Sequence, residues 1–192
     1  MLRGSAQDLR TPLARLGLSI EMLRDQADAQ LVAEAAQDLD DMNQLSEQYL
    51  QLGQALAGDG PEEIDVRDII DRCIIDARRM HSDIQWHPGD PCMLTVQPLA
   101  LARILANLLQ NAVRYGEGRG VTVECVQGTD TYIIKVLDRG RGIPETEREA
   151  VFRPFYRLEP SRGSSTGGSG LGLAIARQLA QFHGWALTLS AR

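Results

Sequence analysis

The first third of the chain carries apolar residues at alternating spacings of three and four. One stripe runs from Leu9 to Leu23 and a second, longer one from Leu31 to Leu56, with polar residues between the two and on the other positions. This spacing is typical of α-helices whose apolar face packs in a bundle. The pattern predicts a helical hairpin.

An isolated hairpin would leave part of each apolar stripe in water. Two hairpins side by side close a four-helix bundle around one core, so we expect a homodimer formed through the hairpin. A bundle made with later helices of the same chain is the alternative on packing grounds.

The segment from Gly58 to Pro61 combines two glycines with a proline, which predicts a linker. We therefore expect a hairpin domain over 1–57, a linker over 58–61 and a second domain over 62–192. Within the second domain, period-two apolar runs alternate with helical patterns, which favours a layered α/β or α+β fold. We expect helices at Val66–Met80, Pro98–Tyr115 and Gly170–Phe182, and strands at Ile84–Trp86, Met93–Val96, Val121–Gln127, Tyr132–Leu137 and Ala186–Leu189.

Composition narrows the classes of function. A net charge of −6 over 192 residues leaves no broad basic face, which argues against a nucleic-acid partner. Cys73, Cys92 and Cys125 are odd in number and widely spaced, which argues against a disulfide framework and a zinc site and favours a reducing cytosol. No run of about 18 apolar residues occurs, so we expect a cytoplasmic fragment that does not insert into a membrane.

The helix expected at 98–115 carries four polar or aromatic residues that can face one ligand. Asn107, Asn111, Arg114 and Tyr115 follow one another at steps of four, three and one. An amide oxygen can hold Mg²⁺ beside phosphate oxygens, and an arginine can reach the same phosphates. An amphipathic helix with solvated polar residues is the alternative.

Two glycine-rich segments follow. Asp138 ends an apolar strand before Gly140 and Gly142, where a carboxylate can accept a hydrogen bond from the exocyclic amine of adenine and bare backbone can approach a flat ring. Gly170 and Gly172 stand at a helix start, where unpaired N–H groups attract anions. No GK[ST] follows, so this is not a Walker loop. An ordinary turn and a flexible glycine cap are the alternatives.

In this order, the segments resemble the four nucleotide-binding boxes of histidine kinases of the GHKL ATPase superfamily. NLLQNAVRY (107–115) is similar to the N box, DRGRGIP (138–144) to the first glycine box, FRPFYR (152–157) to the F box and GGSGLGLAIA (167–176) to the second glycine box. The resemblance implies a Bergerat-type ATP-binding sandwich, with ATP and Mg²⁺ as cofactors. Family members usually have another strand after the one that precedes Arg192. The resemblance therefore also implies that the last strand of the domain is missing from this chain.

The resemblance assigns roles by position. It implies that Asn111 ligates Mg²⁺, that Asp138 binds the adenine amine, and that Phe152, Phe155 and Arg157 anchor a lid formed by the glycine- and serine-rich loop at 162–168, which we expect to be mobile. The other residues implied to contact the nucleotide are Asn107, Arg114, Tyr115, Gly140, Gly142, Arg157, Gly168, Gly170, Leu171 and Gly172.

One residue helps to distinguish a kinase from an ATP hydrolase. Gyrase and mismatch-repair relatives of the superfamily place a general-base glutamate four residues before the magnesium asparagine, where this chain has Asn107. An amide cannot activate water. The kinase interpretation is therefore favoured over an ATPase of the gyrase, mismatch-repair and heat-shock class, or an inactive ATP-binding scaffold.

The first helix contains AQDLRTPLARL (6–16), which resembles the family's H box, but Gln7 stands at the position of the phosphate-accepting histidine. A carboxamide cannot attack a γ-phosphate, so we expect autophosphorylation to be lost. Asp8 and Thr11 remain, and the resemblance implies that they serve phosphotransfer and the dephosphorylation of a response regulator receiver domain. It further implies an inner-membrane sensor as the parent protein. His81, His87 and His183 are expected to be ordinary surface or core histidines.

Overall fold

The computed structural model describes residues 60–79, 83–129, 131–158 and 169–190, together with positions 15, 18, 35, 42, 52, 53, 55, 56 and 58. The chain divides into two compact units, one of Met1–Gln51 with Pro160–Ser169 and one of Leu52–Glu159 with Gly170–Arg192. In the first unit, the described positions Arg15, Leu18, Ala35 and Met42 are helical. The remainder of the predicted hairpin lies outside the described residues.

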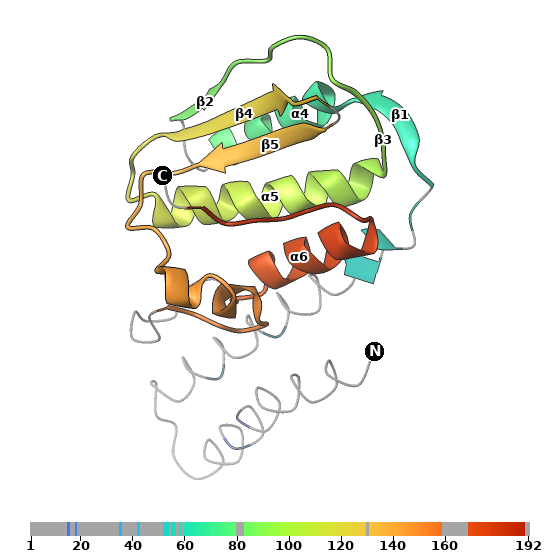
Figure 1. Cartoon of the computed structure of the whole chain (residues 1–192). Helices are drawn as coiled ribbons and strands as arrows, with labels where there is room; N and C mark the ends of the chain where they lie inside the picture. Colours follow the sequence, from blue (N-terminus) through green and yellow to red (C-terminus); the bar gives the residue numbers. More distant parts are fainter. Residues whose placement is uncertain are drawn as a thin grey trace. The chain divides into compact units, whose positions relative to one another are not determined.

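The second unit contains a three-stranded sheet in the order β2-β4-β5 (Figure 1). Strand β2 (Ile84–Trp86) runs parallel to β4 (Val121–Gln127), which pairs antiparallel with β5 (Tyr132–Leu137). Gly128 donates its N–H to the carbonyl of Thr131 at 2.7 Å and so closes the β4–β5 hairpin. These three strands agree with the sequence prediction, as does the α/β fold class.

A second, two-stranded sheet pairs β1 (Glu62–Asp65) with β3 (Met93–Val96) in antiparallel fashion. Sequence reasoning missed β1, because the segment EEID has little apolar alternation and is fixed by pairing with a strand about 30 residues away. The strand predicted at Ala186–Leu189 is wrong, since this stretch is irregular in the structure. Half-buried and exposed residues do alternate along it, but no described strand pairs with its backbone.

Besides the helical positions Leu52, Gly53, Ala55 and Leu56, this unit has three α-helices among its described residues. They are α4 (Val66–Arg78), α5 (Pro98–Tyr115) and α6 (Gly172–Phe182), and α5 packs against both of the others. Helix α6 begins two residues later than predicted, because Gly170 adopts a left-handed φ of +71° that ends the preceding loop. None of the described helices has the length and apolar character needed to cross a membrane.

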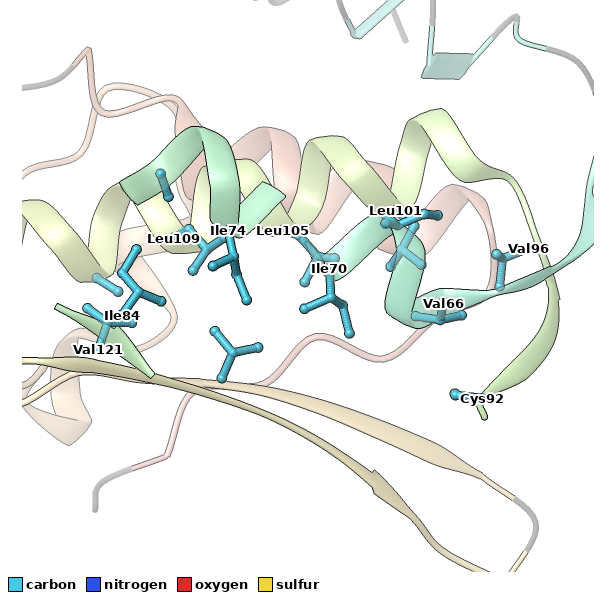
Figure 2. Close-up of a cluster of buried hydrophobic side chains, with 14 residues drawn as sticks. Val66, Ile70, Ile74, Ile84, Cys92, Val96, Leu101, Leu105, Leu109 and Val121 are labelled. Atoms are coloured by element: carbon cyan, nitrogen blue, oxygen red, sulfur yellow. The ribbon is translucent and has the colours of Figure 1, made fainter. Parts of the chain in front are cut away.

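The core lies between α4, α5 and one face of the sheet (Figure 2). Figure 2 shows Ile70 and Ile74 of α4 beside Leu105 and Leu109 of α5, above the strands. Each buried aliphatic side chain contributes about 1.5–3 kcal/mol through the hydrophobic effect. The remaining buried members come from the strands, the two helices and the loop before β3, namely Val66, Ile69, Ala77, Ile84, Cys92, Val96, Leu101, Ala112, Val121 and Val123.

A polar cluster lies at the start of α4, at one end of this core. Asp65 caps α4 by accepting the Arg67 backbone N–H at 3.1 Å and also accepts the Cys92 N–H at 3.2 Å. The Arg67 side chain binds the same carboxylate at 2.6–3.0 Å and reaches the Gly89 carbonyl at 2.8 Å. These bonds fix the loop before β3 onto the start of α4.

The side-chain hydrogen bonds from Arg67 are the largest cause that lowers the pKa of Asp65, from 3.8 to about 2. Because folding lowers the pKa of Asp65, its ionised carboxylate stabilises the folded state. This stabilisation is complete above the ordinary pKa of 3.8 and is lost as the pH falls toward the folded pKa of about 2. We expect Asp65→Asn to melt at a lower temperature than the parent chain near neutral pH and to lose less stability on acidification. Thermal unfolding measured from about pH 5 to about pH 2 tests this. Glu63→Gln, an exposed carboxylate on β1, is the control; equal acid sensitivity of the parent and Asp65→Asn would contradict the prediction.

Candidate functional site

The second half of α5 carries the four polar or aromatic residues predicted for the site. Asn107 is buried, with 6% of its surface exposed, and Asn111 lies half-buried one turn later. Arg114 and Tyr115 are exposed in the last turn. The Nδ2 atom of Asn107 is buried and has no hydrogen-bond partner among the described residues. A buried amide donor without a partner is costly, so this atom is suited to a ligand.

The second glycine box lies directly against Asn107. A Cβ atom added to Gly172 would stand 3.4 Å from Asn107 Oδ1, so the backbone of Gly172 lies close to the amide. Gly172 is the first residue of α6, which has no side-chain cap, and Leu171 before it is buried. Uncapped N–H groups and the helix dipole attract anions at such a start. The buried amide donor and this helix start therefore lie next to each other.

The first glycine box lies against the end of α5. A Cβ atom added to Gly140 would come within 2.1 Å of the Tyr115 carbonyl oxygen, so only glycine fits there. The Gly140 N–H donates to Asp138 Oδ1 at 2.8 Å, which holds the half-buried carboxylate at the end of β5 over the turn. Gly142 has a φ of +72°, in the left-handed region that favours glycine.

Two short 3₁₀ helices, η1 (Glu145–Glu147) and η2 (Ala150–Phe152), lead into the F box. Phe152 is buried, and the Arg177 guanidinium of α6 lies 4.7 Å from its ring centre. Arg177 also pairs with Glu149 at 2.7 Å. The cation–π contact and the ion pair therefore attach the F-box segment to α6.

The F box also meets the second glycine box through backbone contacts. Phe155 has a left-handed φ of 64° and donates its N–H to the Gly170 carbonyl at 3.1 Å. A Cβ atom added to Gly170 would come within 2.9 Å of the Phe155 backbone. Nearby, Tyr156 donates its hydroxyl to Glu147, and this hydrogen bond is the largest cause that raises the pKa of the phenol.

The structure thus gathers most of the predicted residues around α5 and the start of α6. Arg157 is half-buried at the end of the F box. The predicted residues Gln7, Asp8, Thr11 and Gly168, and the loop at 162–168, lie outside the described residues. Sequence reasoning missed Arg177, and no local pattern could have found it, because Glu149 and Phe152 lie more than 20 residues earlier.

The donor set fits a nucleoside triphosphate with Mg²⁺. An unpartnered amide donor and an uncapped helix start suit phosphate oxygens, and an amide oxygen on the same helix suits Mg²⁺. Asp138 offers a carboxylate at the other end of the site, beside bare backbone.

Two family models match the chain. The family described as "Histidine kinase-, DNA gyrase B-, and HSP90-like ATPase" matches residues 96–192. The family described as "His Kinase A (phospho-acceptor) domain" matches residues 1–58. The first match contains all four boxes, and the second contains the segment with Gln7.

Similar proteins agree with these matches. The chain is 34% identical to the sensor histidine kinase GtrS of Pseudomonas aeruginosa over 97% of this chain and 38% of that protein. Among solved structures, the mycobacterial sensor histidine kinase MprB is 35% identical with a TM-score of 0.56, over 65% of this chain and 80% of that one. The ATP-binding domain of PrrB from Mycobacterium tuberculosis is 32% identical with a TM-score of 0.52, over 66% and 83%.

The contact of Gly140 with Tyr115 predicts a cost for any side chain. We expect Gly140→Ala to lose about 1–3 kcal/mol of unfolding free energy, because the new methyl group must displace backbone rather than a flexible side chain. Urea unfolding measures this. Gly89→Ala is the control, since no heavy atom lies within 4 Å of its added Cβ, and should change stability by less than about 0.5 kcal/mol. Equal stability of the two variants would contradict the close packing.

Proposed function

Because this chain belongs to the sensor histidine kinases of two-component systems, we propose that its second unit binds Mg-ATP between α5, the first glycine box and the start of α6. The observation that carries the proposal is the contact of both glycine boxes with α5. Gly172 lies against Asn107, and Gly140 lies against Tyr115. One helix therefore links the proposed phosphate end of the site to its proposed adenine end.

The proposed roles follow from the chemistry of each group. Asp138 accepts a hydrogen bond from the exocyclic amine of adenine, and guanine, with a carbonyl at that position, leaves the carboxylate unpaired. The Asn107 amide and the N–H groups at the start of α6 bind phosphate oxygens. Asn111 would hold Mg²⁺, which neutralises phosphate charge when bound. The exposed Arg114 and Tyr115 line the nucleotide.

The F box has a positioning role in this proposal. Its contacts with Arg177 and with the Gly170 carbonyl hold Phe155 and Tyr156 beside the second glycine box. The loop at 162–168 connects these two segments in sequence. We propose that the F box is the fixed end from which this loop covers the phosphates.

Asn107 also argues against hydrolysis as the primary reaction. A hydrolase needs a general base that takes a proton from water, and an amide has no basic atom for this. Asn107 is itself buried, and a Cβ atom on Gly172 would lie 3.4 Å from its side-chain oxygen. We therefore propose that bound ATP is kept for a protein acceptor.

The proposed acceptor step fails in this chain as it stands. Gln7 occupies the phosphoacceptor position within the segment that matches the phospho-acceptor domain. A carboxamide nitrogen is not nucleophilic, so no phosphoramidate forms. We propose that the chain dimerises through its helical hairpin and docks a response regulator receiver domain, which Asp8 and Thr11 would still help to dephosphorylate.

The chain spans 38% of the length of GtrS and 42% of the sensor histidine kinase CpxA of Escherichia coli. We propose that the parent protein is likewise a longer sensor, anchored in the inner membrane by segments outside this chain. The unit described would then be its cytoplasmic catalytic part.

The first test concerns the adenine end. We expect Asp138→Asn to weaken ATP or ADP binding by about 1–3 kcal/mol, roughly 5- to 150-fold, because a charged acceptor is lost. Isothermal titration calorimetry measures this. Asp90→Asn, which changes an exposed carboxylate remote from the boxes, should bind as the parent does. Unchanged affinity in Asp138→Asn would contradict the role of Asp138 in binding adenine.

The second test concerns the acceptor. With γ-labelled ATP, we expect no acid-labile label on the parent chain and restored labelling in Gln7→His, because imidazole supplies the missing nucleophile. Loss of regulator dephosphorylation in Thr11→Ala would support the role given to Thr11. Label on the parent chain that survives alkali and is lost in acid would show another phosphohistidine and overturn the claim about Gln7.

A further inference from the structure

Two of the three cysteines meet in the fold although 33 residues separate them. Cys125 lies on β4, opposite Ile134 of β5, and Cys92 lies in the loop before β3. The Cys125 thiol donates to Cys92 Sγ with a sulfur–sulfur distance of 3.6 Å. The third cysteine, Cys73 on α4, instead contacts the Ala102 carbonyl of α5.

The backbone on both sides holds this pair in place. Cys92 donates its N–H to Asp65, and its carbonyl accepts the Val66 N–H at 2.9 Å. Cys125 sits within the β4–β5 ladder. Figure 2 shows Cys92 at the end of the core nearest Val66. The backbone of Cys92 therefore cannot move away from the start of α4 without loss of these hydrogen bonds.

The two thiols differ in access. Cys92 is 1% exposed, whereas Cys125 is half-buried. Desolvation of Cys92, followed by its contact with Cys125, raises the pKa of the Cys92 thiol to about 12. At neutral pH Cys92 is therefore a thiol that reagents in solvent do not reach, and Cys125 is the sulfur that they meet first.

We propose that Cys92 and Cys125 form a redox-modification site, in which Cys125 reacts first with a small-molecule disulfide and Cys92 closes an intramolecular disulfide. A disulfide needs a sulfur–sulfur distance of about 2.0 Å, so the two sulfur atoms must approach each other from their separation of 3.6 Å. The proposal adds to the proposed nucleotide binding and does not depend on it.

The chemistry balances with the small disulfide as oxidant. The Cys125 thiolate attacks one sulfur of the small disulfide, which forms a mixed disulfide and releases one small thiol that takes up the proton from Cys125. The Cys92 sulfur then attacks the Cys125 sulfur of the mixed disulfide. This forms the protein disulfide and releases the second small thiol with the proton from Cys92. The two cysteines are oxidised, and one small disulfide is reduced to two thiols.

The crosslink would join parts of the unit that no backbone ladder joins. It connects β4 of the three-stranded sheet to the loop that leads into β3 of the two-stranded sheet. Cys125 lies toward the end of β4 remote from Asp138, which follows the Thr122–Leu137 pairing. We therefore expect oxidation to raise the melting temperature and leave nucleotide affinity unchanged.

Mass spectrometry of the full chain tests the proposal. The chain in a Cys73→Ala background, which keeps only the pair, is treated with excess oxidised glutathione and then alkylated under denaturing conditions. We expect a mass about 2 Da below that of the reduced chain, a peptide that links Cys92 to Cys125, and a melting temperature about 5–15 °C higher, all reversed by dithiothreitol.

Single variants separate the two roles. Cys92→Ala should retain one glutathione on Cys125, because the resolving thiol is missing, and Cys125→Ala should leave Cys92 unmodified while the chain is folded. The unaltered chain should form the same Cys92–Cys125 disulfide, and Cys73 should remain a thiol. A lasting mixed disulfide on the two-cysteine chain, an unmodified pair, a link to Cys73 or a crosslink between two chains would each overturn the proposal.

Discussion

The packing of α5 on three sides is the constraint on which the rest of the unit depends. Its apolar face meets α4 and the sheet, and it also packs against α6. Because Asn107 and Tyr115 stand on this same buried helix, their positions follow from core packing. The two glycine boxes then lie against fixed backbone and side-chain atoms of α5, and at position 140 only glycine fits.

Much of this fold could be predicted from the sequence, because the apolar pattern of its helices and central strands has the period of the structure that each segment adopts. Val121 and Val123 alternate with polar residues on β4, and Ile70 and Ile74 recur at helical spacing on α4. Strand β1 could not be predicted, because its acidic residues form a strand only through pairing with β3. The predicted strand at Ala186–Leu189 shows the reverse case, where a correct alternation lacks a described partner strand.

The candidate site likewise has residues that the sequence could predict and contacts that it could not. The order of the boxes along the chain was sufficient to name Asn107, Asp138 and Gly172, because each belongs to a contiguous motif. The contact of Arg177 with Phe152 and the meeting of Cys92 with Cys125 could not be named, since each joins residues 25 or more positions apart. Spacing within one segment carries no information about such pairs.

The side-chain amide of Asn107, whose Nδ2 atom has no hydrogen-bond partner among the described residues, has a consequence for the lifetime of the protein in a cell. Because this buried donor has no partner among the described residues, a ligand that accepts its hydrogen bond would stabilise the fold. A ligand at 100 times its dissociation constant adds about 2.7 kcal/mol to folding, which lowers the unfolded fraction roughly 100-fold. Where proteases act on unfolded chains, a ligand bound at this atom would therefore lengthen the lifetime of the protein.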